Sequence, residues 1–259
     1  MTRRHIFFAC EGSQLVGTLD EAAGECALLI VTGGNELRAG AWNGQAQFAA
    51  RVAPAGFPVF RFDRRGVGDS EGANAGFRGS AADIAAALAA LRAEAPQVRR
   101  VFGFGNCDGA SALMLSAGAG FDGLILSNPW TIEETAGDAP AAPPPAAVRA
   151  HYLQRLKDPR AILRLLKGGV AIGKLFASLR AALRPAPPPS SLAQEMAAGL
   201  KRFTGPVRIL LAERDRTAQV FDAVWDKSDK RVARCPGATH SYVESQDWLE
   251  SQVLSALRA

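Results

Sequence analysis

Cys107 has the sequence surroundings of a catalytic nucleophile. It stands in a Gly-Asn-Cys-Asp-Gly box at 105–109, after an apolar run and before small and apolar residues typical of a helix. This is the strand–sharp turn–helix pattern of a nucleophile elbow, with cysteine in the usual place of serine. Glycines two residues to either side let strand and helix approach around a strained turn, and a helix N-terminus stabilises a thiolate. The alternative is a buried structural cysteine.

A base and an acid follow Cys107 along the chain. Of the three histidines, only His240 lies in a loop between the last predicted strand and the last predicted helix. Asp215 follows the preceding strand and is preferred to Glu213, because it lies far enough past the strand end to turn back toward the histidine. Such an acid fixes the imidazole tautomer and stabilises the imidazolium.

Taken singly, these two residues have ordinary structural explanations. His240 would be a surface-loop histidine, and Asp215 would be a helix N-cap before Thr217. All three groups in nucleophile–acid–histidine order, each after a strand, predict a Cys107–His240–Asp215 triad.

An oxyanion hole needs two backbone N–H groups directed at the developing negative charge. The residue after the nucleophile, Asp108, supplies one. The second is expected from the loop after strand 26–31, at Gly34 or Asn35, where glycine lets the backbone approach a substrate. A plain Gly-Gly turn is the alternative for this loop.

The elements that position these residues alternate between strand and helix. Strands are predicted at 4–8 and 14–19 (a hairpin), 26–31, 58–63, 100–104, 123–127, 207–212 and 230–234. Helices are predicted at 44–55, 80–95 (capped by Ser80), 108–117, 192–200, 218–225 and 246–258. This alternation predicts an α/β fold: a mostly parallel sheet of about eight strands with helices on both faces and sites at the strands' carboxyl ends.

Composition narrows the class of protein. The chain is 48% hydrophobic and 21% charged, as in ordinary soluble domains, and no apolar run has the length of a membrane span. The four cysteines are widely spaced, which argues against a zinc site and a disulfide framework. We therefore expect a cytoplasmic protein without metal or cofactor.

Proline-rich stretches at 136–145 and 185–189 border a basic segment. Residues 146–202 carry a net charge of +9, whereas the remainder of the chain carries −4. Helical patterns at 146–157, 159–167 and 172–183 predict that residues 131–191 form a helical cap inserted after the sixth strand, with a core of 1–130 and 192–259. The charge would attract CoA phosphates or an acidic carrier protein, unless it is only a solvated surface. The amphipathic pattern at 172–183 also allows peripheral contact with anionic lipid.

Several motifs resemble a known family. The turn at 63–72, Asp-Arg-Arg-Gly-Val-Gly-Asp-Ser-Glu-Gly, is similar to the Asp-x-Arg-Gly-x-Gly-x-Ser turn of many α/β-hydrolases. More narrowly, the chain resembles the exosortase A system-associated hydrolases. The shared features are Gly-x-Cys-Asp-x-Ala-Ser at 105–111, Gly33-Gly34 with Arg38, Asn128-Pro129-Trp130, and His-Tyr-Leu-Gln-Arg at 151–155. The resemblance implies an α/β-hydrolase fold in a bacterial protein encoded near extracellular polysaccharide and protein-sorting genes, often beside an acyl-CoA ligase and an acyl carrier protein. Asn35-Glu36 departs from the Pro-Gln that relatives often have.

A sulfur nucleophile favours thioester chemistry. A thiolate exchanges with an acyl thioester at little thermodynamic cost, so we predict a cysteine-dependent acyl hydrolase, a thioesterase or esterase. Arg38, Trp130 and His151 are candidate substrate contacts. Alternatives are an acyltransferase, since Gly-x-Cys-x-Gly also occurs in polyhydroxyalkanoate synthases, a non-catalytic binding module and a dienelactone-hydrolase-like enzyme. The predicted partner is a small-molecule or carrier-bound acyl substrate, and no nucleic acid.

Overall fold

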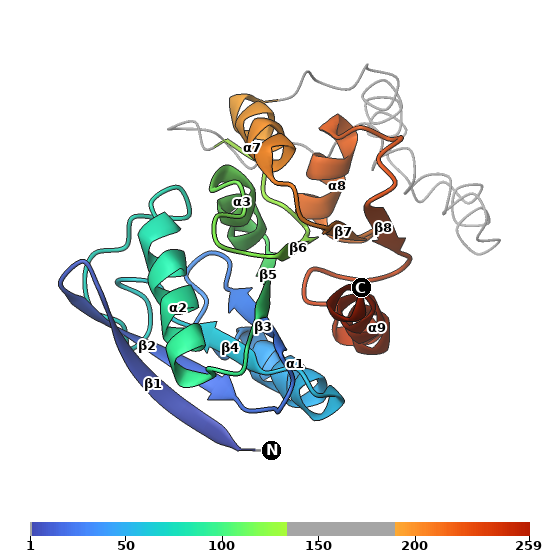
Figure 1. Ribbon diagram of the computed structural model, residues 1–259. Coiled ribbons are helices and arrows are strands. Elements are labelled where there is room, and N and C mark those ends of the chain that lie inside the picture. The colour runs from blue at the N-terminus through green and yellow to red at the C-terminus, as the bar shows by residue number, and fades with distance from the viewer. Residues whose placement is uncertain (1, 134–189) are drawn as a thin grey trace, which may run out of the picture.

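The computed structural model describes residues 2–133 and 190–259, which form an eight-stranded sheet in the order β1-β2-β4-β3-β5-β6-β7-β8 (Figure 1). β1 (Arg3–Cys10) and β2 (Ser13–Asp20) form the predicted hairpin, and β2 also pairs antiparallel with β4 (Val59–Phe62). β4 runs parallel to its other neighbour, β3 (Cys26–Val31), and the parallel sheet continues with β5 (Arg100–Asn106), β6 (Gly123–Ser127), β7 (Val207–Ala212) and β8 (Val232–Cys235). The prediction of a mostly parallel sheet of about eight strands is confirmed.

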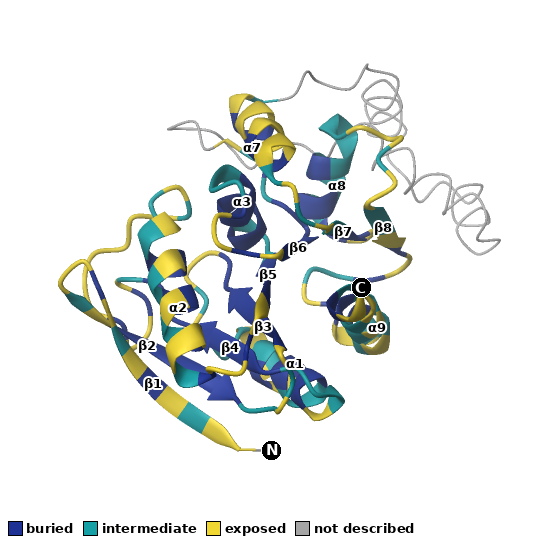
Figure 2. Cartoon of the chain, in the orientation of Figure 1, coloured by how far each residue is buried: buried dark blue, intermediate teal, exposed yellow. Residues whose placement is uncertain are grey.

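Helices cover both faces of the sheet, as predicted (Figure 1). α1 (Gly44–Val52) and α9 (Gln246–Arg258) lie on one face, and α2 (Ala81–Glu94), α3 (Asp108–Leu115), α7 (Ser191–Arg202) and α8 (Arg216–Val224) on the other. β3 shows why its sequence is apolar throughout. Its alternate side chains enter two hydrophobic clusters, one on each face, so the strand is buried on both sides (Figure 2).

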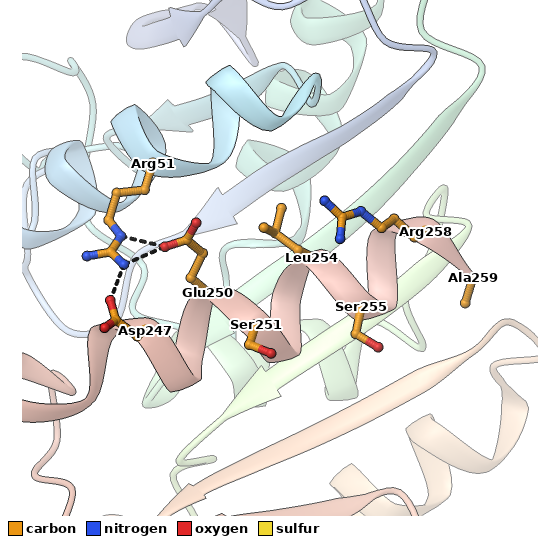
Figure 3. Close-up of a pocket in the computed structure, with 8 residues that line it drawn as sticks. All are labelled: Arg51, Asp247, Glu250, Ser251, Leu254, Ser255, Arg258 and Ala259. Carbon is orange, nitrogen blue, oxygen red and sulfur yellow. Dashed lines mark hydrogen bonds and ion pairs between the residues drawn. The ribbon is translucent and has the colours of Figure 1, made fainter.

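Polar contacts join α1 to α9 on their shared face. Arg51 of α1 pairs with Asp247 of α9 and with Glu250, whose Oε2 lies 2.5 Å from the Arg51 Nη2 atom (Figure 3). A shallow groove runs along these residues toward Arg258. The described residues that line it include none of the predicted site residues.

The element boundaries differ from the predicted ones in a few places. α1 ends at Val52, and a 3-10 turn over Ala53–Ala55, which contains a proline, replaces its predicted last turn. Ser80 precedes α2 at the predicted N-cap position, but its hydroxyl donates to the carbonyl of Phe77 at 2.8 Å and makes no cap. α8 begins two residues earlier than predicted, at Arg216.

The predicted cap lies almost entirely outside the described residues, including its three helical patterns at 146–183. The described chain resumes at Ser190, just before α7 begins at Ser191, and the Ser190 side chain accepts the N–H of Ala193 at 3.2 Å. None of the helices in the described part of the chain combines the length and the hydropathy of a membrane span.

Candidate active site

Cys107 occupies a sharp turn between β5 and α3. Its backbone has φ 58° and ψ −126°, a conformation that L-residues adopt only where the surrounding structure imposes it. The neighbouring glycines explain how the turn closes. A Cβ on Gly105 would lie 2.5 Å from the backbone nitrogen of Ala110, and one on Gly109 would lie 2.3 Å from the carbonyl oxygen of Val31. The turn therefore has the backbone of a nucleophile elbow, with the half-buried cysteine at its apex.

His240 connects Cys107 with Asp215. The Nδ1 atom of His240 lies 3.0 Å from Oδ1 of Asp215. Hydrogen bonds to Asp215 and then to the Cys107 side chain raise the pKa of His240 to about 10, against the opposing effect of burial. The imidazole is therefore protonated at neutral pH, and its positive charge lies beside the sulfur. The charged imidazole and the sulfur, whose thiolate is the nucleophilic form of cysteine, are therefore neighbours in the structure.

Asp215 makes a second contact that fixes its side chain. Its Oδ2 atom accepts the backbone N–H of Ala218 at 2.9 Å and so caps the N-terminus of α8. The sequence allowed Asp215 to be either a helix cap or a partner of His240. Both contacts are present, because Oδ2 caps the helix and Oδ1 faces the histidine. Because the side chain is 9% exposed, both oxygens act in a largely buried environment.

The two loops with the predicted oxyanion donors contact each other. Asp108 is the first residue of α3, where backbone N–H groups have no partner within the helix. Its carboxylate Oδ1 accepts the N–H of Gly34 at 2.6 Å. Arg64 donates to the Gly34 carbonyl and lies 3.4 Å from the same Asp108 oxygen. Burial raises the pKa of Asp108, while Arg64 and the Gly34 N–H oppose that rise.

A pocket of about 910 Å³ opens beside Cys107. The predicted oxyanion residues Gly34, Asn35 and Asp108 line it, together with Trp130. Ser111 holds the Trp130 backbone in place, since its hydroxyl donates to the Trp130 carbonyl at 2.8 Å and accepts the Trp130 N–H at 2.9 Å. Other lining residues are the apolar Phe77, Ile132 and Leu192 and the charged Arg64, Arg78 and Glu133.

The sequence interpretation missed Arg64, which is 2% exposed. Its Nε and Nη1 atoms have no hydrogen-bond partner among the described residues. Arg64 follows β4, and its position after a strand's carboxyl end was the available signal.

Arg38, another predicted substrate contact, does not line this pocket. Arg38 pairs with Asp63 and with Asp69, the latter at 3.0 Å, and lines a separate pocket of about 400 Å³ with His5 and other residues. The buried Asp63 carboxylate attracts the guanidinium there. His151 lies outside the described residues.

An eight-stranded sheet with its nucleophile-elbow turn after β5 defines the α/β-hydrolase class of proteins. The comparison with family models agrees, because residues 28–251 match the model of the alpha/beta hydrolase family. The chain belongs to this family. A comparison with curated proteins gives no match.

Solved structures share the fold at low sequence identity. An esterase from Pyrococcus furiosus has a TM-score of 0.65 at 15% identity, over 99% of this chain and 90% of that one. The α/β hydrolase GrgF from Penicillium sp. sh18 has a TM-score of 0.64 at 16% identity, over 100% and 98%. A serine hydrolase without a lid from Xanthomonas campestris has a TM-score of 0.59 at 15% identity, over 99% and 94%. At these sequence identities, the similarity shows a shared fold and nothing further.

Proposed function

We propose that this α/β hydrolase is a cysteine-dependent acyl hydrolase that acts on acyl thioesters. One observation carries the proposal: Cys107 lies on the strained elbow turn and is hydrogen-bonded to a histidine that Asp215 orients. A triad is recognised by such mutual geometry, whatever the fold or the nucleophilic atom. Trp130 and the apolar residues of the adjoining pocket support an acyl group as the bound moiety.

The chemistry follows from the protonated state of His240. The Cys107 thiolate adds to the thioester carbonyl carbon, and backbone N–H groups of Asp108 and of Gly34 or Asn35 stabilise the oxyanion. The carbon–sulfur bond to the leaving group breaks, and His240 protonates the departing thiolate. Neutral His240 then takes a proton from water as the water attacks the acyl-cysteine. The Cys107 thiolate leaves, and a carboxylic acid is released.

Coenzyme A and acyl carrier protein are the proposed leaving groups. The basic segment 146–202 would attract the phosphates of either one. The motifs shared with exosortase A system-associated hydrolases support a bacterial setting in which both carriers are at hand. Cys10, Cys26, Cys107 and Cys235 are all free thiols, which agrees with a reducing cytoplasmic compartment.

A thioester panel tests the proposal. Wild-type protein is incubated with acetyl-, butyryl- and octanoyl-CoA, and free CoA, free acid and protein mass are measured by chromatography and mass spectrometry. We expect free acid and CoA in equal amounts from the wild type and from Cys235→Ala, a control at a buried cysteine. Cys107→Ala should release neither. Full activity of Cys107→Ala would overturn the triad.

The panel also separates the alternatives. A Cys107 acyl-enzyme that accumulates and discharges only when an amine or alcohol acceptor is added would replace hydrolysis by acyl transfer. Absence of both turnover and acyl-enzyme, with Cys107 alkylated by iodoacetamide no faster than Cys10 or Cys235, would leave a binding module with the hydrolase fold.

A further inference from the structure

We propose that Asn128 is a positioning residue that fixes the relative placement of the three loops carrying Cys107, Asp215 and His240. The inference rests on the proposed function and adds to it a residue outside the triad. Asn128 directly follows β6, which lies in the sheet between β5 and β7. It therefore stands between the strand that leads to Cys107 and the strand that leads to Asp215.

The side chain of Asn128 makes four hydrogen bonds. Its Nδ2 atom donates to Oδ1 of Asn106 at 3.2 Å and to the carbonyl oxygen of His240 at 3.1 Å. Its Oδ1 atom accepts the N–H of Ala212 at 2.9 Å and the hydroxyl of Tyr242 at 3.2 Å. An amide has two N–H donors and two acceptor lone pairs, so all of its bonding capacity is used.

The orientation of this amide follows from its backbone partners. The carbonyl of His240 can only accept and the N–H of Ala212 can only donate, so Nδ2 faces the histidine loop and Oδ1 faces the end of β7. Asn128 is 0% exposed, which makes each bond costly to lose because water cannot replace it.

The partners of Asn128 indicate a positioning role and not only the hydrogen bonding that any buried polar side chain requires. One is the residue before Cys107, one is His240 itself, and one lies three residues before Asp215. A shift of this amide would move all three loops relative to one another. Hydrogen bonds that lock supporting residues hold a catalytic group within a fraction of an ångström of its productive position.

The backbone of Asn128 suits asparagine as well. Its φ is 44°, in the left-handed region that asparagine, aspartate and glycine tolerate better than other residues. Its N–H also donates to the carbonyl of Leu210 at 2.9 Å. Replacement by aspartate or glycine therefore alters the side-chain bonds while keeping a residue that accepts this backbone.

Asn128→Asp is the primary test because it is isosteric and removes the two donors. A carboxylate oxygen would then face the His240 carbonyl and the Asn106 Oδ1 atom, both acceptors. We expect kcat on the best thioester to fall about 100-fold, as for an ångström-scale misplacement, with KM changed by less than about threefold. We also expect the pH profile of Cys107 alkylation to move, because that profile reports the Cys107–His240 pair.

A matched control separates this effect from lost stability. Ser70 is also buried and also joins two backbone segments, since its hydroxyl donates to the Asp63 carbonyl at 2.7 Å and accepts the Val16 N–H at 2.9 Å. Ser70→Ala should lower the melting temperature while leaving kcat and the alkylation profile in place. If Asn128→Asp does not fold, Tyr242→Phe removes one of the four bonds and should shift kcat in the same direction by a smaller factor.

The outcomes separate the two proposals. If wild-type Cys107 reacts no faster than Cys10 and hydrolyses nothing, the proposed function fails and Asn128 has no triad to position. If the wild type is active and both Asn128→Asp and Tyr242→Phe keep its kcat and alkylation profile, the positioning role alone is refuted. An equal loss in Ser70→Ala would also refute it, because a general loss of core hydrogen bonding would then suffice.

Discussion

The Nδ1 atom of His240 lies 3.0 Å from Oδ1 of Asp215, while the other oxygen of the same carboxylate caps α8 at Ala218. The contact at Nδ1 leaves Nε2 for the nucleophile, and it keeps the imidazole charged over the physiological range, with a pKa of about 10. In the mechanism that we propose, the histidine would act first as an acid toward the leaving group and then as a base toward water. The proton balance of that mechanism would depend on Asp215.

Asp215→Asn should lower the pKa of His240, since the hydrogen bond from Asp215 is the largest cause of its rise. With less imidazolium beside the sulfur, Cys107 alkylation at pH 7 should slow, and thioester turnover should fall on the order of 10³-fold or more. Rates of iodoacetamide labelling between pH 5 and 10, read by mass spectrometry, give the profile. An unchanged profile would show that Asp215 does not set the charge of the histidine.

The same substitution should change how stability depends on pH. The folded pKa of His240 is raised above its ordinary value of 6.5, so its contribution is complete below pH 6.5 and is lost as pH rises through about 10. Urea unfolding of wild type should therefore show a decline across this window that is weaker in Asp215→Asn. The helix cap is not expected to confound the comparison, because asparagine caps helices as well as aspartate.

Asp108→Ala tests which N–H completes the oxyanion hole. The Asp108 carboxylate accepts the Gly34 N–H, and a substrate oxygen that uses this donor must displace it. Removing the carboxylate should raise kcat/KM about tenfold, which is the lower range for a charge-assisted hydrogen bond. Asp247→Ala removes an exposed carboxylate outside this pocket and should leave kcat/KM unchanged. A tenfold fall in Asp108→Ala would instead assign Asn35 as the second donor and make Asp108 a support of the loop.

Gly105→Ala should be among the most disruptive single-methyl changes in the protein. The added Cβ would lie 2.5 Å from backbone atoms of Gly109 and Ala110, and neither can yield without opening the elbow. We expect a loss of about 3 kcal/mol of unfolding free energy, the upper range for overpacking, together with loss of Cys107 reactivity. Gly44→Ala is the matched control, because its Cβ meets nothing within 4 Å and its backbone is already helical. This control should be neutral or stabilising in urea titrations.

Arg61→Met should destabilise the fold through the charge that it leaves behind. Arg61 is 2% exposed and holds Oδ2 of the fully buried Asp20 at 3.0 Å. Asp20 would keep Arg3 at 2.6 Å, so we expect a cost of about 3 kcal/mol, the low end for breaking a buried pair. Arg78→Met breaks an exposed pair with Glu195 and should cost less than about 1 kcal/mol. Equal costs in chemical denaturation would contradict this account.

Much of the fold was predictable because burial leaves a mark on the sequence. β3, β6 and β7 have the predicted bounds, since strands buried on both faces read as uninterrupted apolar runs. The 3.0 Å contact between His240 and Asp215 has a different origin. Loops that follow strands at one edge of a parallel sheet come together, so residues in such loops can be expected to lie close to one another.

The contacts between loops were beyond the reach of the sequence. Arg38 pairs with the buried Asp63 and does not reach the pocket beside Cys107. This contact forms because the pairing of β3 with β4 brings the loops that follow the two strands together. The bond from Gly34 to Asp108 likewise depends on the pairing of β3 with β5. Such choices are made by long-range register, which leaves no local pattern. Asn128 was visible only as part of a motif, and its four partners come from distant parts of the chain.

The divided role of Asp215 bears on how activity could be lost in evolution. A descendant of this chain that no longer turned over substrate would be free to replace Cys107 and His240, yet it would still need an N-cap for α8. Asp215 would then be retained only because the helix cap stabilises the fold. The aspartate alone therefore does not distinguish enzymes from pseudoenzymes among homologues of this protein. The presence of the cysteine and the histidine is the informative criterion.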